Sequence, residues 1–162
     1  MRFCLTILFL ACAAAAASAS DASGKIVKVL PLYLDLKGHD AVSPSLFDRD
    51  AYQAELREQQ TNISAIRFDV LWKASGLSRQ SSASADGKNS TLKLRAELRG
   101  VGTNGFPRQA VLEMDVTPHL FRHWTSLTLR GEDFKNLGSL VAWKMSLVQG
   151  DKLLAEQKSF LW

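Results

Sequence analysis

The sequence predicts a mainly β protein: a seven-stranded antiparallel β-sandwich with one short helix inserted between the first and second strands. Three observations lead to this prediction. Apolar and polar residues alternate along most of the chain, most clearly in residues 65–74 and 91–100, as they do in strands with one wet and one dry face. The segments are joined mostly by short connections that contain glycine or proline. Two such sheets can bury their dry faces only against each other.

The first 19 residues have the composition of a secretory signal peptide. Arg2 supplies the positive start, residues 3–11 the apolar run, and residues 17–19 the small-residue cleavage pattern. We therefore expect an exported protein, periplasmic or extracellular, whose residues 20–162 form a single domain. Cys12 leaves a lipoprotein open as an alternative.

Composition narrows the function classes further. The chain has 20 Lys and Arg residues against 16 Asp and Glu, and because the charges are interspersed they favour solubility and argue against nucleic acid as a partner. Both cysteines, Cys4 and Cys12, lie in the leader. The mature chain therefore has no disulfide and no cysteine metal site. No stretch after the leader is apolar enough for a transmembrane segment.

The first predicted strand covers residues 25–37, and Pro31 within it indicates an edge strand. Its expected buried face consists of Ile26, Leu30, Leu32, Leu34 and Leu36. Residues 38–62 change character and predict a helical insert, with Asp48 as the cap of a helix that ends near Gln59. Phe47, Ala51, Ala54 and Leu56 are its expected packing face.

Four central strands follow from alternation. Their expected inward residues are Ile66, Phe68, Val70, Trp72 and Ala74; Leu92, Leu94, Ala96 and Leu98; Ala110, Leu112, Met114 and Val116; and Leu127 and Leu129. Residues 75–90 are rich in serine and predict a flexible loop. Residues 131–139 predict a corner that buries Phe134 and Leu137.

The chain closes with a predicted hairpin over residues 139–162. Gly150-Asp151 is typical of a two-residue turn, which would place Gln149 opposite Lys152. In that register four pairs share one face: Leu147 with Leu154, Met145 with Glu156, Trp143 with Lys158, and Val141 with Phe160. A bulge would change these faces. The second strand carries charge, which suits an edge.

The strand count and spacing over residues 25–162, with Trp72 and Trp143 as candidate core rings, resemble those of small exported bacterial sandwiches of the immunoglobulin-like or fibronectin type III-like kind. The chain departs from the pattern in three ways: it lacks the cysteine pair, it carries the insert of residues 38–62, and Phe134 occupies the corner where tyrosine is usual. A resemblance at this level implies a fold and no particular function.

No motif of a hydrolase, phosphate-binding loop or zinc protease is present. His119 and His123 are four residues apart, but Pro118 precedes them and a strand follows, so ordinary loop histidines are favoured over a metal site. Asp35, Asp40, Asp48 and Asp50 fit no known calcium loop. We expect no cofactor, no metal and no enzymatic activity.

The candidate contact surface is a loop rim formed by His119, Arg122, His123 and Trp124, because loops 75–90, 117–124 and 149–152 would gather at one end of such a sandwich. The predicted function is a binding or structural module for a protein or glycan partner in the envelope or outside the cell. One alternative is a glycan-binding module that stacks sugars on Trp124, Trp162 or Tyr33. A small hydrolase stays open as well, and the aromatic C-terminus leaves a small outer-membrane barrel as the last alternative.

Overall fold

The computed structural model describes residues 22–76, 91–118 and 121–162. The predicted signal peptide, nearly all of the predicted loop of residues 75–90, and His119 lie outside the described residues. What we infer for those parts of the chain stays a prediction.

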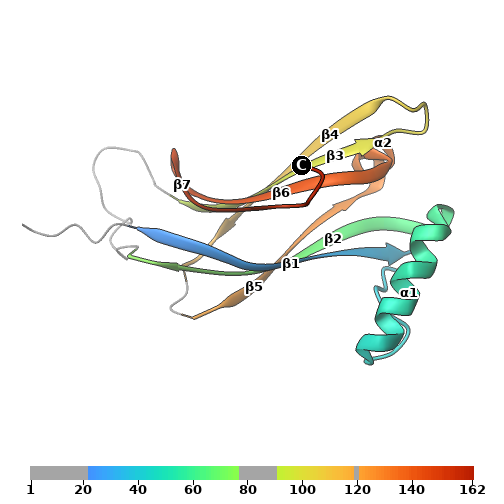
Figure 1. Ribbon diagram of the computed structural model, residues 1–162, viewed down its shortest axis with the longest axis horizontal. Coiled ribbons are helices and arrows are strands. Elements are labelled where there is room, and N and C mark those ends of the chain that lie inside the picture. Colours follow the sequence, from blue (N-terminus) through green and yellow to red (C-terminus); the bar gives the residue numbers. More distant parts are fainter. Residues whose placement is uncertain (1–21, 77–90, 119–120) are drawn as a thin grey trace, which may run out of the picture.

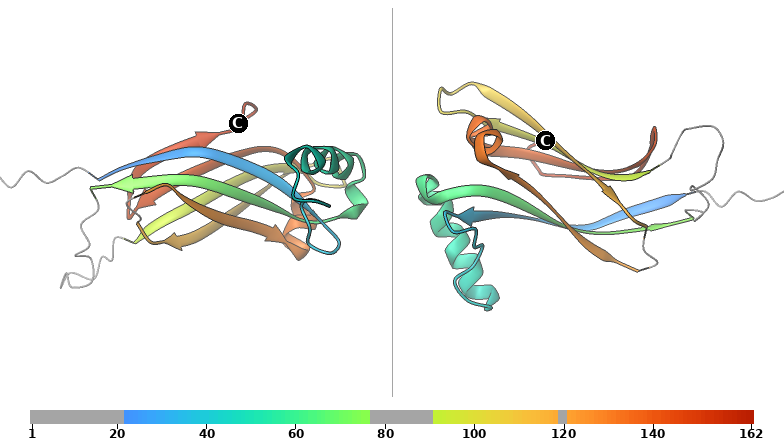
Figure 2. Two further views of the ribbon diagram at one scale, coloured as in Figure 1. Left: turned by 90° about the horizontal axis from the view of Figure 1, so that it is seen from below. Right: turned by 180° about the vertical axis from the view of Figure 1, so that it is seen from behind.

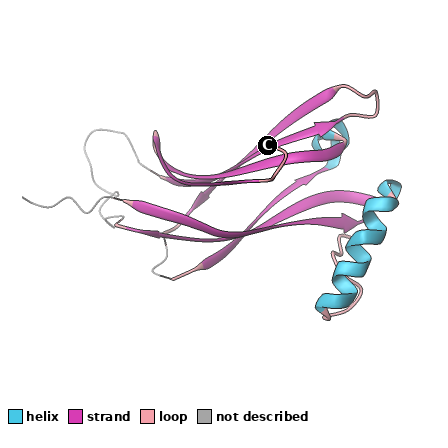
Figure 3. Ribbon diagram, viewed as in Figure 1, coloured by secondary structure: helices cyan, strands magenta, loops and turns pink. Residues whose placement is uncertain are grey.

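In the described part of the chain, seven strands form two antiparallel sheets that face each other, which confirms the predicted mainly β sandwich (Figure 1). The three-stranded sheet has the order β1-β2-β5 and the four-stranded sheet the order β4-β3-β6-β7. The strands are β1 (Ser23–Asp35), β2 (Ile63–Ser75), β3 (Leu92–Val101), β4 (Pro107–Val116), β5 (His123–Arg130), β6 (Ser139–Gln149) and β7 (Lys152–Lys158). The helices, cyan in Figure 3, are α1 (Leu46–Glu58) and α2 (Gly131–Leu137), and a 3₁₀ turn covers Gln60–Asn62.

The core lies between the sheets and follows the predicted alternation. All five inward residues predicted for β2 and all four predicted for β3 are buried. Phe68 of β2 meets Trp143 of β6 edge to face, with ring centroids 6.5 Å apart. Met114 is an exception in β4, since its side chain is 40% exposed near the free edge of the sheet.

The face predicted for β1 is wrong in part. A register irregularity between Ile26 and Lys28 shifts the alternation, so Val29 joins Ile26 in the core. Leu32 and Leu34 are buried on the opposite face, on the side where α1 contacts β1. Leu36 lies beyond the strand and is exposed. Pro31 does lie in an edge strand, as predicted.

The closing hairpin keeps its predicted turn and edge position but not its register. Gln149 pairs with Lys152 as predicted, and a bulge at Leu147/Val148 then shifts the pairing by one residue. Leu147 therefore lies opposite Ala155, and Phe160 pairs with nothing because β7 ends at Lys158. The bulge has a physical reason: without it, Glu156 would lie opposite Met145, and its charge would enter the core.

A second irregularity flips the start of β6. The pairing with β3 shifts between Arg99 and Gly100, which leaves Val141 exposed although the alternation predicts it inward. Leu140 takes its place against the core. The register therefore had to be read from the structure.

Helix α1 forms where the insert predicted a helix, but Ser45 caps it instead of Asp48. The Ser45 hydroxyl accepts a bond from the Asp48 backbone N–H. The buried face consists of Gln53 and Leu56, whereas the predicted packing residues Phe47, Ala51 and Ala54 are exposed. Because one of the two buried residues is the polar Gln53, the periodicity of apolar residues did not identify this face.

Gln53 explains why the helix is placed there. Its side-chain amide accepts from the Tyr33 backbone N–H at 2.8 Å and donates to the Tyr33 carbonyl at 2.8 Å. The amide also donates to the Asp40 carbonyl at 2.9 Å. Because β1 is an edge strand, Gln53 supplies the bonds that a neighbouring strand would have made, and α1 thereby covers the end of that edge.

Helix α2 replaces the predicted corner at residues 131–139, and Leu137 is buried there as predicted. The helix ends at Gly138, whose φ of +70° is the left-handed conformation typical of a helix end. A side chain at Gly100 would collide with the Leu137 backbone, so a glycine is required at this close approach of β3.

Candidate binding surface on the three-stranded sheet

The described residues of the predicted loop rim lie at the start of β5, at the end of the sandwich where the β6–β7 turn also lies (Figure 1). Arg122 directly precedes the strand, and His123 and Trp124 are its first two residues. His119 is outside the described residues. The predicted site is therefore carried in large part by a strand, and strand alternation divides it between two faces.

His123 belongs to the inner side. It pairs with Trp72 across the strands, and its ring meets the Trp72 ring edge to face with centroids 6.4 Å apart. Thr125, two residues along, accepts a bond from Trp72 Nε1 at 2.9 Å. His123 and Thr125 therefore close the end of the core around the largest buried ring.

Trp124 belongs to the outer face of the three-stranded sheet. It pairs with Leu71 of β2, which in turn pairs with Lys28 of β1, so these three side chains form one row across the sheet. The Trp124 side chain is 46% exposed. The exposed Trp124 ring and the half-buried Leu71 side chain form a small apolar patch on this face.

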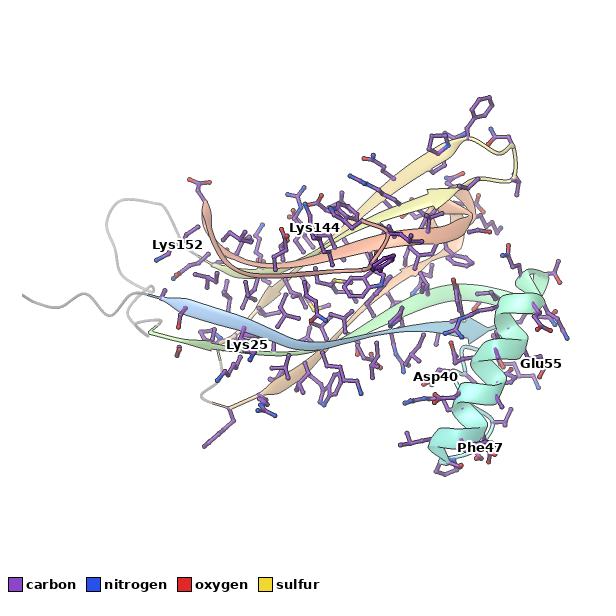
Figure 4. The ribbon with its side chains drawn as sticks, viewed as in Figure 1. Lys25, Asp40, Phe47, Glu55, Lys144 and Lys152 are labelled. Atoms are coloured by element: carbon purple, nitrogen blue, oxygen red, sulfur yellow. The ribbon has the colours of Figure 1, made fainter. Side chains whose placement is uncertain are left out.

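A second row lies one step nearer the end of the strands. Lys25 pairs directly with Lys73, and Arg122 directly precedes His123, which pairs with Trp72, the neighbour of Lys73 in the chain. Figure 4 shows Lys25 on the side of the sandwich away from the four-stranded sheet. We call Lys25, Lys28, Leu71, Lys73, Arg122 and Trp124 the cationic face.

None of the carboxylates that the structure describes neutralises the charge of the cationic face. Within residues 22–76, 91–118 and 121–162, no ion pair involves Lys25, Lys28, Lys73 or Arg122. Like charges directly opposite each other, as at Lys25 and Lys73, are unfavourable in a sheet. An anion bound over this face would relieve that repulsion.

The same sheet changes character towards α1. Arg67 donates to Asp40 at 3.0 Å and forms a two-point pair with Asp69 at 3.0 and 3.1 Å. Ser126 donates to Asp69 at 2.6 Å. These groups bond to one another, so each of these charged side chains has a partner of opposite charge.

The outer face of the four-stranded sheet also carries ion pairs. Glu97 pairs with Lys144 at 3.0 Å and with Arg95 at 3.4 Å, and Glu113 pairs with Arg95 and Lys93. Lys144 lies on the side of the molecule opposite to Lys25 (Figure 4). Both faces therefore carry lysine and arginine. They differ in whether described carboxylates form ion pairs with those cations.

The other predicted stacking rings are not available as platforms. Tyr33 packs against the core, and burial raises the pKa of its phenol. Trp162 folds back onto the four-stranded sheet, where the Arg99 guanidinium lies 3.9 Å and Lys144 Nζ 5.0 Å from the ring centroid. Of the three rings in the glycan hypothesis, Trp124 is the one presented on an open face.

The acidic residues considered for calcium have other partners. Asp35 accepts from the backbone N–H groups of His39 and Lys37 and from the Tyr52 hydroxyl, and these bonds lower its pKa. The bond to Asp35 raises the pKa of Tyr52. Asp48 accepts from Ser43 at 2.6 Å, and Asp50 pairs with Arg49. Among the described residues, no group of three or more His, Cys, Asp or Glu side chains is arranged to hold a metal ion.

A pocket of about 620 Å³ lies at the opposite end of the sandwich, between the end of the three-stranded sheet and α2. Its walls include Leu34, Ile63 and Phe134, with Arg130 and Lys135 among the polar lining residues. Lys135 is already paired with Glu132 at 2.9 Å. The pocket contains no constellation of acid, base and nucleophile.

Sequence reasoning singled out Arg122 and Trp124 but missed Lys25, Lys28 and Lys73. A signal was present, because alternation places Lys73 on the outer side of β2. The pairing of β1 with β2 and β5 brings the cations together, and that pairing cannot be read from alternation alone.

Comparisons with protein-family models, with curated proteins and with solved structures found no match to this chain. Over the described residues, neither α1 nor α2 is long and apolar enough to cross a membrane.

Proposed function

We propose that this chain is an exported, non-enzymatic β-sandwich module that binds a component of the envelope or of the extracellular space through its cationic face. The observation that carries the proposal is the group of four cations around the exposed ring of Trp124 that have no acidic partner in the part of the chain that the structure describes. Elsewhere on the two outer faces, Arg67, Arg95 and Lys144 form ion pairs with carboxylates. An unbalanced charge cluster beside an exposed aromatic ring is what a binding surface requires.

The strand order supports an immunoglobulin-like type of sandwich as part of this proposal. In the constant-type immunoglobulin order, strands A, B, E and D form one sheet and C, F and G the other. Strands β1, β2 and β5 correspond to A, B and E, and β3, β6 and β7 to C, F and G. Strand β4 differs, because it pairs with β3 instead of β5.

Export is supported by the composition of residues 1–19. The non-enzymatic assignment is supported by the way reactive groups are used. The hydroxyls of Tyr52 and Ser126 donate to the carboxylates of Asp35 and Asp69, and each carboxylate also holds a loop or an arginine. Such bonds fix the local structure.

The test is equilibrium binding of the purified protein to an isolated envelope fraction, measured by sedimentation. Lys25→Ala/Lys73→Ala should weaken binding at least tenfold, and Trp124→Ala should weaken it as well. The matched control is Arg108→Ala/Lys158→Ala, which removes the same charge from β4 and β7 of the other sheet. Equal binding by both double variants would remove the cationic face from consideration.

Glycan binding is the second candidate function, and the exposed ring of Trp124 is the observation that favours it. Titration of tryptophan fluorescence with acidic and neutral polysaccharides tests it. A glycan ligand should change the emission of the protein and leave that of Trp124→Phe unchanged. No response to any polysaccharide would discard this candidate.

A further inference from the structure

We propose that the cationic face docks on an anionic lipid surface, with the projecting start of α1 as a second point of contact. This inference rests on the proposed function, because it names the envelope component that the same face would bind. It is argued from charge, from exposed apolar side chains and from the shape of the molecule.

The charged side chains of the cationic face all have the same sign and lie close together. Lys25 and Lys73 pair across β1 and β2, Arg122 directly precedes β5, and Lys28 lies in the row of Leu71 and Trp124. Strands are about 4.8 Å apart, so these cations lie close enough to act on several lipid headgroups at once. The nearest carboxylate along β2, that of Asp69, is already paired with Arg67. Anionic lipid surfaces attract such basic clusters.

The aromatic residues suit a membrane interface. Trp124 is 46% exposed among the cations, and Phe121, 80% exposed, directly precedes Arg122. Tryptophan is enriched where membranes meet water, since its ring is apolar and its N–H polar. Lysine can lay its apolar stem along such rings while its charge stays at the headgroups.

The shape of the molecule favours a flat surface over a linear chain as the ligand. Val42, Leu46 and Phe47 are exposed around the start of α1, and Phe47 is 81% exposed; we call these three residues the α1 tip. Figures 1 and 2 show that this end of α1 projects beyond the three-stranded sheet on its outer side, the side that carries the cationic face. Figure 4 shows Phe47 at the far end of this projection.

A flat bilayer can therefore touch the cationic face and the α1 tip together. A polysaccharide that lay across β1, β2 and β5 would cover the cations and leave the tip in water. Exposed apolar groups at two separate places on one side of the molecule indicate a partner that is itself extended and apolar beneath a charged surface.

The experiment uses protein purified from the envelope fraction of expressing cells, so that every variant carries the same N-terminus. Binding is measured by co-sedimentation with vesicles of phosphatidylcholine alone and of phosphatidylcholine with 30 mol% phosphatidylglycerol. We expect binding to the anionic vesicles that falls steeply between low salt and 0.5 M salt. Each lysine contributes about fivefold to binding, so Lys25→Ala/Lys73→Ala should bind roughly 25-fold more weakly.

The controls separate charge, insertion and fold. Arg108→Ala/Lys158→Ala should bind within twofold of the unaltered protein. Phe47→Ser should bind severalfold more weakly and keep the dependence on anionic lipid, and vesicles should shift the tryptophan emission of the protein but not that of Trp124→Phe. An unaltered far-ultraviolet circular dichroism spectrum shows that each variant is folded.

Two results would overturn the inference. Equal vesicle binding by the two double variants would mean that the cationic face is not the contact. Binding to soluble polygalacturonate with none to anionic vesicles would make the ligand an acidic glycan. In that second case binding to the envelope fraction would still depend on Lys25 and Lys73, so the proposed function would stand while the lipid assignment fails.

Discussion

The two outer faces of the sandwich use the same residue types with opposite electrostatic results. On the four-stranded sheet, Lys144 and Arg95 share Glu97. On the three-stranded sheet, Lys25 faces Lys73. Carboxylates therefore offset cations on the four-stranded sheet, the balanced face, whereas no described carboxylate pairs with Lys25 or Lys73 on the other, the unbalanced face. Net charge alone does not locate a binding surface; the pairing of strands decides which charges meet their opposites.

The difference extends to the tryptophans. Trp162 lies against the balanced face with Arg99 and Lys144 over its ring, so the cations there are occupied by the chain itself. Trp124 lies on the unbalanced face, where its ring is open to solvent. The C-terminal Trp162 thus covers cations of the four-stranded sheet, whereas no described residue covers the cations of the three-stranded sheet in this way.

The largest expected effect tests whether the two faces share one core. Phe68 is fully buried between the sheets and touches Trp143. Phe68→Ala should lower the free energy of unfolding by about 3–5 kcal/mol, since it leaves a cavity at the contact of the sheets. Urea denaturation should still show one transition. Two separate transitions would mean that the sheets fold independently.

The second effect concerns the protection of the three-stranded sheet by α1. Gln53→Ala removes both bonds to the Tyr33 backbone and leaves these groups unpaired at a buried edge. The expected loss of stability is about 1–3 kcal/mol. Exposed Glu55 on the same helix is the control, and Glu55→Ala should change stability by less than about 0.5 kcal/mol. Comparable losses in the two variants would contradict the role of Gln53.

The third prediction converts the balanced face into an unbalanced one. Glu97→Gln removes the carboxylate that Arg95 and Lys144 share. Stability should fall by about 0.5–1 kcal/mol, because the pairs are only partly buried. The loss should shrink at high salt. A loss that is independent of salt would point to packing instead of charge.

The fourth prediction reverses the change on the opposite face. Lys73→Glu places a carboxylate opposite Lys25 and beside Arg122. It should stabilise the fold by about 0.2–1 kcal/mol, since it replaces a repulsive pair by an attractive one. The same variant should lose binding to the envelope fraction. A destabilised Lys73→Glu would show that the cations do not repel one another in the free protein.

The smallest expected effect is a pH dependence at the α1 end of the three-stranded sheet. The pKa of Asp35 is lowered by its hydrogen bonds, chiefly the one from the His39 N–H. Its contribution to stability is therefore complete above the unfolded pKa of 3.8 and is lost as the pH falls through the lower folded value. The pKa of Tyr52 is raised by its bond to Asp35, so that contribution is complete below pH 10 and is lost as the pH rises through the folded pKa.

Asp35→Asn should flatten the dependence of the melting temperature on pH at both the acid and the alkaline limits. Asp133, which is exposed on α2, serves as the control position. If Asp35→Asn and the unaltered protein had parallel profiles, the loop around Asp35 would not contribute to stability through its carboxylate.

Alternation in the sequence was sufficient for the central strands and insufficient for their register. It placed Ile66 to Ala74 and Leu92 to Leu98 correctly, because every second residue there is apolar and no bulge intervenes. It failed at Val141, which is exposed, and it missed the bulge at Leu147/Val148, which shifts the pairing of β7 although Leu154 packs against the core as predicted. The helix in the insert was found, but its cap and packing face were missed, since Ser45 caps it and it buries Gln53, whose side chain makes hydrogen bonds.

The candidate surface was likewise predicted only in part from the sequence. Arg122 and Trp124 stood out because two unusual residues adjoin in one segment. The lysines that give this surface its charge come from β1 and β2, at positions 25, 28 and 73. No local pattern joins residues that are nearly 50 positions apart.

The sequence by itself determined that the chain forms a mainly β sandwich, since a period of two in side-chain polarity requires sheets with one dry face. Which strands are neighbours, where the bulges fall and which charges are neutralised were decided only by the tertiary structure. The physical reason is that cross-strand contacts depend on register, and register is set by the combined packing of both sheets around Trp72, Phe68 and Trp143.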